Sequence, residues 1–283
     1  MTDLEIRPMT AADVEAAAAV YRAGGWGERR DMLEWVLANP TIRPLVGLAD
    51  GAVVATAMAT INGPVGWVGS IFVDAALRSR GYGRAMTAAA CELIDAAACR
   101  TQILIASTYG RPLYDKMGFR LDEEYQVLEA PPLDPLAAGA TPPPPGTRLR
   151  RMRPEDLGGV FALDRRATGE DRSAIIGTLL SSGWVLERGV EPRGYLASIH
   201  PDCGAVVALD IEAAACLLDR LRLDAAGRAG SIRAVVPAGH ESGWRGLEQL
   251  GWTRAFRTPR MLRGDPVDWD PTLIWGVLSF GFG

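Results

Sequence analysis

The sequence predicts an α/β (α+β) protein made of two similar halves, and three observations support this. Short apolar runs alternate with Ala-rich segments of helical periodicity along the chain. Seven prolines fall within residues 130–146, a composition typical of a semi-rigid linker that tends toward polyproline II. After this segment, residues 149–157 repeat the pattern of residues 6–14 position by position. We therefore predict domains at 1–130 and 147–283, joined by a linker at 131–146.

The composition excludes several classes of protein. The 283 residues carry a formal net charge of −4, which argues against a general nucleic-acid-binding surface. No apolar leader opens the chain and no apolar run approaches a membrane span, so we expect no membrane partner. The 4 cysteines lack Cys-x-x-Cys spacing and the 2 histidines are too few for a metal site, so we expect no metal. The cytoplasm is the expected compartment.

In the first half, capping and turn residues mark the ends of the expected elements. Thr10 suits a helix N-cap, glycines at 24–27 separate two helices, and Asp50 with Gly51 forms a tight turn between paired strands. The expected strands are 6–9, 45–48, 52–61, 67–73, 101–106 and 121–129. The expected helices are 10–21, 28–38, 85–98 and 111–117. The strand at 121–129 is expected to close this half.

The second half reads as a degenerate copy of the first. Residues 247–252 echo residues 114–119, but Leu247 stands in the place of Tyr114. A strand at 205–209 runs almost directly into a helix at 211–221, with no glycine-rich loop between them. This half therefore keeps a scaffold without a phosphate loop or an aromatic hydroxyl, and we expect no anion cradle there.

The best-defined motif of the first half joins the strand at 67–73 to the helix at 85–98. This loop contains Gly81, Gly83 and three arginines. Glycine lets a ligand approach the backbone closely, and N–H groups at a helix N-terminus bind anions with help from the helix dipole. The loop suits a phosphate or pyrophosphate, and a tight turn with solvated arginines is the simpler alternative. Met86 replaces the third glycine of a Gly-x-Gly-x-x-Gly fingerprint.

Two motifs together resemble the GCN5-related N-acetyltransferase (GNAT) family. Arg78-x-x-Gly-x-Gly after an apolar strand is similar to motif A, and Leu113-Tyr114-x-x-x-Gly-Phe is similar to motif B. The resemblance implies two tandem GNAT-like domains, each a mixed, mostly antiparallel sheet flanked by helices, with the second one degenerate. It also implies direct, ternary-complex transfer of the acetyl group of acetyl-CoA to a primary amine of a small-molecule acceptor.

The resemblance assigns roles to the motif residues. Tyr114 would be the catalytic general acid that protonates the departing CoA thiolate, since the usual pKa of a phenol lies near that of a thiol. The strand backbone would bond the pantetheine arm, the loop would hold the pyrophosphate, and a backbone N–H would polarise the acetyl carbonyl. The implied acetyl-CoA contacts are Ile71, Phe72, Val73, Arg78, Ser79, Arg80, Gly81, Tyr82, Gly83, Arg84 and Ser107. Ser107 stands where the family usually has asparagine.

In the resembled family, the helices before the first hairpin line the acceptor pocket. Trp26, Glu28 and Asp31 are therefore candidate substrate contacts. Glu28, Asp31 or a chain of waters could take the proton that the amine must lose, and both acids equally suit the start of a helix. The residue pattern does not determine which of these groups is the general base.

The second half has an Asp…Gly-x-Asp-Arg element with no counterpart in the first. Asp164, Asp171 and Arg172 are the charged residues that we expect at a cleft between the halves, and a capped helix start with surface ion pairs is the alternative. Two other functions stay open for the whole chain. It could be a CoA-binding sensor or scaffold without turnover, or an acyltransferase that uses a longer acyl-CoA. The presence of both the loop and Tyr114 favours an enzyme.

Overall fold

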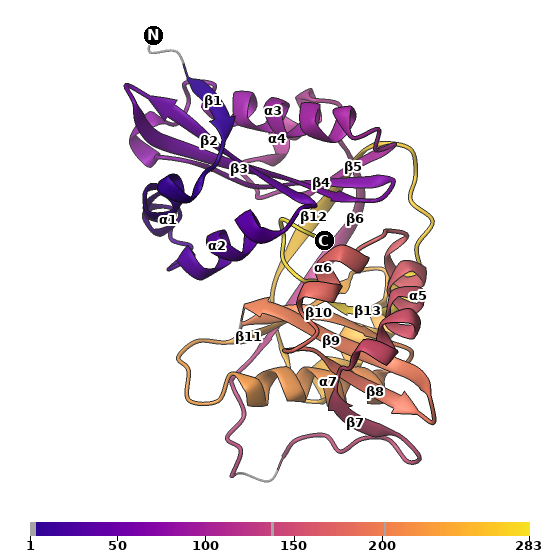
Figure 1. Ribbon diagram of the computed structural model, residues 1–283. Coiled ribbons are helices and arrows are strands. Elements are labelled where there is room, and N and C mark those ends of the chain that lie inside the picture. Colours follow the sequence, from indigo (N-terminus) through magenta and orange to yellow (C-terminus); the bar gives the residue numbers. More distant parts are fainter. Residues whose placement is uncertain (1–3, 137–138, 201) are drawn as a thin grey trace.

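The computed structural model describes residues 4–136, 139–200 and 202–283. Figure 1 shows two lobes, one from each half of the sequence, connected by two long strands. No helix within the described ranges has the length and apolarity needed to cross a bilayer.

The first lobe contains the strands and helices that the sequence predicts, with ends that differ by a few residues. Helices α1 and α2 lie on one face of the sheet, and α3 and α4 on the other (Figure 1). Leu33 and Met58 are buried on the first face, and Met86 and Ile94 on the second. The strands are β1 (Glu5–Pro8), β2 (Ile42–Ala49), β3 (Ala52–Asn62), β4 (Val65–Val73), β5 (Thr101–Ile105) and β6 (Arg120–Ala130). The helices are α1 (Val14–Ala23), α2 (Arg30–Ala38), α3 (Tyr82–Ala96) and α4 (Arg111–Lys116).

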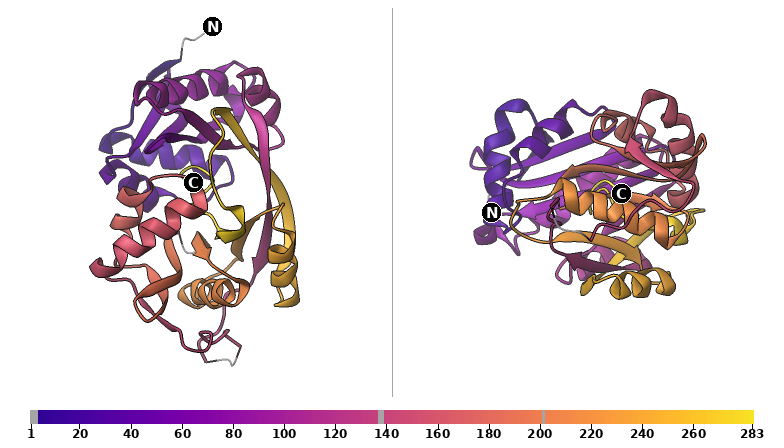
Figure 2. Two further views of the ribbon diagram at one scale, coloured as in Figure 1. Left: turned by 90° about the vertical axis from the view of Figure 1, so that its right-hand side faces the viewer. Right: turned by 90° about the horizontal axis from the view of Figure 1, so that it is seen from below.

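The two halves exchange their long strands. Strand β12 (Thr253–Gly264) of the second half lies between β5 and β6 and pairs antiparallel with both. Strand β6 pairs in turn with β11 (Ile232–Pro237). One sheet of order β1-β2-β3-β4-β5-β12-β6-β11 results, and Figure 2 (left) shows β6 and β12 running together along the molecule. The expectation that the strand at 121–129 closes the first half is wrong, because β6 forms its ladders with strands of the second half.

The second lobe is built on a five-stranded sheet of order β13-β10-β9-β8-β7. Its strands are β7 (Arg148–Arg151), β8 (Trp184–Arg188), β9 (Glu191–His200), β10 (Cys203–Ala208) and β13 (Ile274–Gly276). Its helices are α5 (Leu157–Thr168), α6 (Ser173–Thr178), α7 (Ile211–Asp224) and α8 (Glu241–Gln249). The predicted strand-to-helix junction near residue 210 is present between β10 and α7.

The internal repeat seen in the sequence is reproduced in side-chain contacts. Arg7 donates two hydrogen bonds to the Asp13 carboxylate, at 2.8 and 2.7 Å. Arg150 makes the same bidentate pair of hydrogen bonds to the Asp156 carboxylate, at 2.6 and 2.7 Å. Each pair ties the first strand of its half to the turn that opens the next helix. The repeat is therefore structural as well as sequential.

The ends of α4 and α8 also correspond. Gly118 and Gly251 follow these helices with left-handed backbones of φ 85° and 89°, which glycine adopts without strain. The backbone N–H of the next residue, Phe119 or Trp252, donates to the carbonyl five residues earlier, at 3.1 and 3.0 Å. The motif that ends in Gly-Phe in the first half thus has a structural copy in the second.

Candidate active site

An opening in the large sheet lies where β4 parts from β5. The two strands pair in parallel from Val65 to Trp67, and β4 continues to Val73 with no described β5 residue opposite it. A register shift in the β3–β4 ladder and the left-handed backbone of Ser70 (φ 56°) mark a bulge here. Beyond the bulge, the β5 side of β4 can accept a ligand that adds as a short strand. The predicted contacts at residues 71–73 lie in this segment.

The loop after β4 leads into the N-terminus of α3, which is 15 residues long. Gly81 caps the helix with a left-handed backbone of φ 86°. The first N–H groups of a helix have no acceptor within the helix, so they point into the loop. A β-carbon placed on Gly83 would meet only Val73 Cγ2, at 3.9 Å, so the space in front of this glycine is open. These features fit the predicted anion cradle.

The side chains of the loop differ in what they can do. Arg78, Ser79, Arg80 and Arg84 are exposed. Arg78 Nε donates to the Val73 carbonyl at 3.4 Å, which keeps this guanidinium beside the end of β4. Tyr82 is 7% exposed and packs among apolar side chains.

Tyr114 lies in α4, the helix that follows β5 in the chain. Its ring packs edge-on against Phe119, with centroids 6.2 Å apart, and joins the apolar cluster that contains Met86. Burial raises the pKa of Tyr114 to about 12. This value lies above the usual pKa of a phenol, which is expected to lie near that of the CoA thiol. The phenol therefore stays protonated at physiological pH and can donate.

Two small residues shape the turn before Tyr114. Ser107 Oγ accepts a hydrogen bond from the Gly110 N–H at 3.1 Å, so this side chain fixes the turn just before α4. A β-carbon on Gly110 would lie 2.8 Å from Tyr114 Cε2, so the absence of a side chain lets the ring close over the turn. Whether Ser107 also binds a pantetheine amide stays a prediction.

The three acceptor candidates of the first half lie around the start of α2. Trp26 is 44% exposed, and its ring meets the Phe72 ring of β4 edge-on at 5.2 Å. Glu28 accepts the backbone N–H groups of Arg30 and Arg29 at 2.9 and 3.0 Å and pairs with Arg22 at 2.8 Å, and these bonds lower its pKa. Asp31 is exposed in the first turn of α2. Trp26 thus contacts Phe72 of the predicted site, whereas the Glu28 carboxylate is held by Arg22 and by the N–H groups of Arg29 and Arg30.

The second-half candidates lie at or inside the junction of the lobes. Arg172 and Asp164 are 4% and 1% exposed and form an ion pair, with Nε 3.2 Å from Oδ2. Arg172 also donates to the Tyr195 hydroxyl at 3.2 Å. Asp171 bonds through its backbone N–H to the Asn62 carbonyl of β3, at 3.2 Å. Asp164 and Arg172 therefore form a buried network, not a charged surface.

Among its described residues, the second half offers no equivalent of the β4 opening. Strand β13 pairs with β10 and packs against β11, and Trp275 Nε1 donates to the Ala208 carbonyl at 3.1 Å. The N-terminus of α7 is capped by the Asp210 carboxylate, which accepts the Ala213 N–H at 2.9 Å. A carboxylate at this position repels phosphate, in contrast with the open N-terminus of α3.

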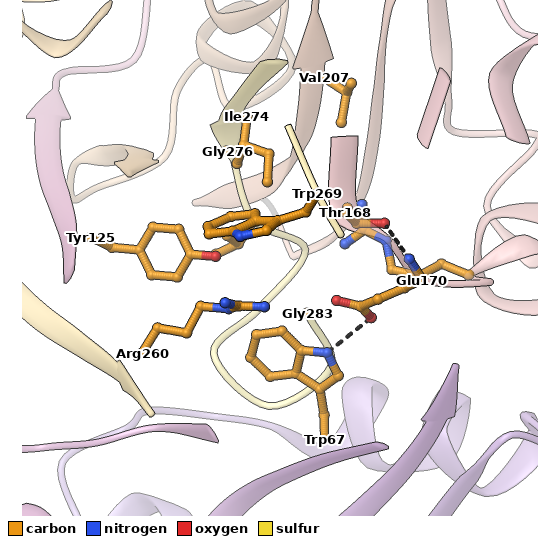
Figure 3. A pocket seen from close by; sticks show the side chains of 12 residues that line it. Trp67, Tyr125, Thr168, Glu170, Val207, Arg260, Trp269, Ile274, Gly276 and Gly283 are labelled. Carbon is orange, nitrogen blue, oxygen red and sulfur yellow. Dashed lines mark hydrogen bonds between the residues drawn. The ribbon is translucent and has the colours of Figure 1, made fainter. Parts of the chain in front are cut away.

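A small polar cavity of about 10 Å³ lies between the lobes beside the buried ion pair (Figure 3). Glu170 enters it from the second half, and its carboxylate accepts Asn62 Nδ2 at 2.7 Å and Trp67 Nε1 at 2.9 Å. Arg260 of β12 faces it with 1% exposure and stacks over the Trp269 ring at 4.2 Å. The volume suits one water. Sequence reasoning missed Glu170 because it occupies the variable position of Gly-x-Asp-Arg.

Glu170 makes the junction of the lobes sensitive to pH. Burial raises its pKa to about 7, although the Arg172 charge and the bonds from Asn62 and Trp67 oppose the rise. A carboxyl whose pKa is higher in the folded state stabilises the fold at low pH, and this stabilisation is lost as pH rises through about 7. Ionisation is expected to cost roughly 3 kcal/mol of folding stability by pH 8.

The Glu170→Gln variant is expected to remove this dependence. Its amide oxygen can accept the same two bonds without a charge, so the variant should match the wild type at pH 5 and melt at a higher temperature at pH 8. Thermal unfolding between pH 5 and 8 checks this, with Glu155→Gln, at a side chain 65% exposed, as the matched control. Identical pH profiles for wild type and Glu170→Gln would show that the carboxyl does not titrate in this range.

Comparisons with known proteins identify the fold. The family model "Acetyltransferase (GNAT) family" matches residues 11–119, and "Acetyltransferase (GNAT) domain" matches residues 160–276. No curated protein matches the chain in sequence.

Solved structures match nearly the whole chain at low identity. A protein from Pyrococcus horikoshii, provisionally described as an acetyltransferase, is 18% identical with a TM-score of 0.81, covering 99% of this chain and 96% of its own. A tandem GNAT protein from the clavulanic acid biosynthesis pathway is 16% identical with a TM-score of 0.68, covering 93% and 99%. A GCN5-related N-acetyltransferase from Sphaerobacter thermophilus is 16% identical with a TM-score of 0.61, covering 94% and 98%. The chain belongs to the GNAT acetyltransferase family, as a tandem, two-domain member.

Proposed function

We propose that the protein is an N-acetyltransferase that moves the acetyl group of acetyl-CoA directly to a primary amine of a small molecule. The observation that supports this proposal is the opening between β4 and β5, where β4 continues beyond its pairing with β5 and leads to the open N-terminus of α3, and Tyr114 lies on the helix that follows β5. The chain offers these parts together in its first half. Family membership supports the use of an acyl-CoA, and the acetyl group is our proposal.

The residues of the opening divide the binding of acetyl-CoA among them. Backbone groups of residues 71–73 would bond the pantetheine arm as an added strand. The N–H groups around Gly81 and Gly83 would hold the pyrophosphate, because they lie at the positive end of the α3 dipole. Arg78 would add a charge-assisted bond of roughly 1.5–3 kcal/mol.

In the reaction, an uncharged amine forms the new N–C bond while the C–S bond of the thioester breaks. The amine loses a proton to water or to a base, and the sulfur gains one, so the products are an N-acetyl amine and the CoA thiol. Tyr114 would give its hydroxyl hydrogen to the sulfur as negative charge develops there. Since its pKa is raised to about 12, the phenol is protonated before the reaction throughout the useful pH range, and the phenolate left by the transfer regains a proton from solvent.

Gly83→Val is expected to weaken acetyl-CoA binding more than tenfold without harming the fold. The β-carbon itself meets only Val73 Cγ2, at 3.9 Å, so a branched side chain would extend into the space proposed for the pyrophosphate. Calorimetric titration with acetyl-CoA measures the affinity, and thermal unfolding checks the fold.

The matched control is Gly158→Val. Gly158 is also the second residue of a helix, α5, and a β-carbon there meets nothing within 4 Å. This variant should bind acetyl-CoA as the wild type does. Equal affinity of Gly83→Val and wild type would move the phosphate site away from the loop.

A further inference from the structure

A segment of the second half, residues 278–283, packs on the sheet of the first half. It follows β13, and Figure 1 shows it in yellow between the two lobes. Asn62 of β3 donates through Nδ2 to the Phe282 carbonyl at 3.2 Å, and the Phe282 ring packs against the Trp35 ring of α2 with centroids 5.9 Å apart. Phe282 is 1% exposed, so the segment is a buried part of the junction between the lobes.

Two glycine backbones meet where this segment crosses β4. A β-carbon placed on Gly69 of β4 would lie 2.3 Å from Gly281 Cα and 2.7 Å from the Gly281 carbonyl oxygen. No side chain therefore fits at Gly69 while the segment is in place. A β-carbon on Gly281 would lie 3.2 Å from Ser70 Oγ and 3.6 Å from the Ser70 nitrogen. The segment thus lies directly on Gly69 and Ser70.

Ser70 belongs to the bulge of β4. A register shift in the β3–β4 ladder gives β4 one residue more than β3 at this point. Ser70 has a left-handed backbone of φ 56°, which is unfavourable for a residue other than glycine and persists only where surrounding contacts hold it. One such contact is the hydrogen bond that Thr56 Oγ1 donates to the Ser70 carbonyl, at 3.0 Å. The Gly281 crossing is another.

The bulge lies at the acetyl end of the proposed acetyl-CoA site. The pyrophosphate is proposed at the loop after β4 and the pantetheine arm along residues 71–73, so the arm would run back from the loop toward Ser70. The thioester would then reach the strand next to the bulge, where a backbone N–H would polarise the acetyl carbonyl. Because a peptide unit is planar, the N–H that follows Ser70 turns with the Ser70 backbone. The conformation of Ser70 therefore decides where this N–H points.

We infer that Gly281 is a positioning residue of the acetyl-transfer site: the segment at 278–283 holds the left-handed backbone of Ser70 and so aims the following N–H at the acetyl carbonyl. The inference rests on the proposed function, since it assumes that acetyl-CoA lies at the β4 opening. Gly281 acts through Ser70 and need not touch the reacting atoms. The second half thus contributes to the reaction without a phosphate loop of its own.

Gly69→Ala tests this inference. Its methyl group would overlap Gly281 Cα, so the segment and the bulge must move apart, whereas the Gly69 backbone is not left-handed and suits alanine. With acetyl-CoA and an acceptor amine found by screening, we expect kcat to fall roughly tenfold or more, because a misdirected donor stabilises the transition state less. Acetyl-CoA affinity, measured by calorimetry, should change less than threefold, because the phosphate loop is unaltered. The number of sites from the same titration corrects kcat for unfolded protein.

Gly66→Ala is the matched control. Gly66 lies on the same strand, and a β-carbon there would lie 2.2 Å from Ile94 Cγ2 of α3, an overlap of similar size. This overlap is on the face of the sheet that α3 covers, away from the 278–283 segment. Gly66→Ala should therefore lower the melting temperature and keep kcat.

Ser70→Gly separates positioning from packing. Glycine adopts the left-handed backbone without strain, so the bulge should depend less on the segment when residue 70 carries no side chain. In the Ser70→Gly background, the further change Gly69→Ala should lower kcat less than threefold. If Gly69→Ala does not fold, Gly281→Val takes its place in the same comparison, because its β-carbon would press on Ser70 Oγ, which Ser70→Gly removes.

The outcomes separate this inference from the proposed function. The inference is overturned if the crossing variant keeps the wild-type kcat, if Gly66→Ala lowers kcat as much, or if the loss is as large in the Ser70→Gly background. Failure of the wild type to bind acetyl-CoA, or to acetylate any amine in the screen, would instead overturn the proposed function.

Discussion

A fragment that ends at Ala130 is expected not to fold as a monomer. Strands β5 and β6 would lose β12, which lies between them and pairs with both. Met261 and Leu262 of β12 have no exposed surface, and burying each contributes roughly 1.5–3 kcal/mol. Each lost ladder hydrogen bond removes about 1 kcal/mol more. The combined loss is comparable with the whole free energy of unfolding of a domain, about 5–15 kcal/mol.

Circular dichroism and sedimentation of the fragment check this expectation. We expect no cooperative thermal transition from a monomeric species. The control is the full chain with a protease site in the linker at 131–146, cut after purification. Its two pieces should remain associated through β6 and β12 and should still bind acetyl-CoA. A monomeric, cooperatively unfolding fragment would show that the exchanged strand is dispensable.

Tyr114→Phe is expected to lower kcat by about 10²–10⁴, the usual contribution of one acid–base group. The substitution keeps the ring and its packing against Phe119 and removes only the hydroxyl, so the fold and the acetyl-CoA affinity should be unchanged. An interaction made only in the transition state lowers kcat and kcat/KM by the same factor. Steady-state kinetics with acetyl-CoA and an acceptor amine found by screening measures kcat and kcat/KM.

A second tyrosine provides the control for this variant. Tyr109, five residues earlier in the same loop region, is 96% exposed, so Tyr109→Phe removes an equivalent hydroxyl outside the opening. It should turn over as the wild type does. The wild type should also show no loss of rate from Tyr114 ionisation below about pH 11, because its pKa is about 12. A Tyr114→Phe enzyme with full kcat would assign the acid role to water.

Local features were predictable because they depend on neighbouring residues. A left-handed backbone at Gly81 and Gly118 could be expected because glycine adopts it without strain. The open space at Gly83 could be expected because glycine has no side chain. The repeat of the halves was visible for the same reason, since Arg7 and Arg150 stand six residues before the acids that they bind.

Features that depend on distant pairings could not be read from the sequence. Strand β12 reads as an ordinary strand of its own half, and no local signal shows that it pairs with β5 more than 150 residues away. Asp164 and Arg172 look like surface charges because the aromatic hydroxyl that joins them, Tyr195, comes from strand β9, whereas they lie in α5 and just before α6. Arg29 and His200 meet only because the lobes pack together, and neither stands in a recognisable motif.

The most direct test of the account is a calorimetric titration of the full chain with acetyl-CoA. In the part of the chain that the structure describes, the opening lies at β4, whereas β13 covers β10 and the Asp210 carboxylate caps α7 in the second half. The account predicts one acetyl-CoA per chain, with binding weakened in Gly83→Val. Two sites per chain, or a single site that Gly83→Val leaves unchanged, would contradict it.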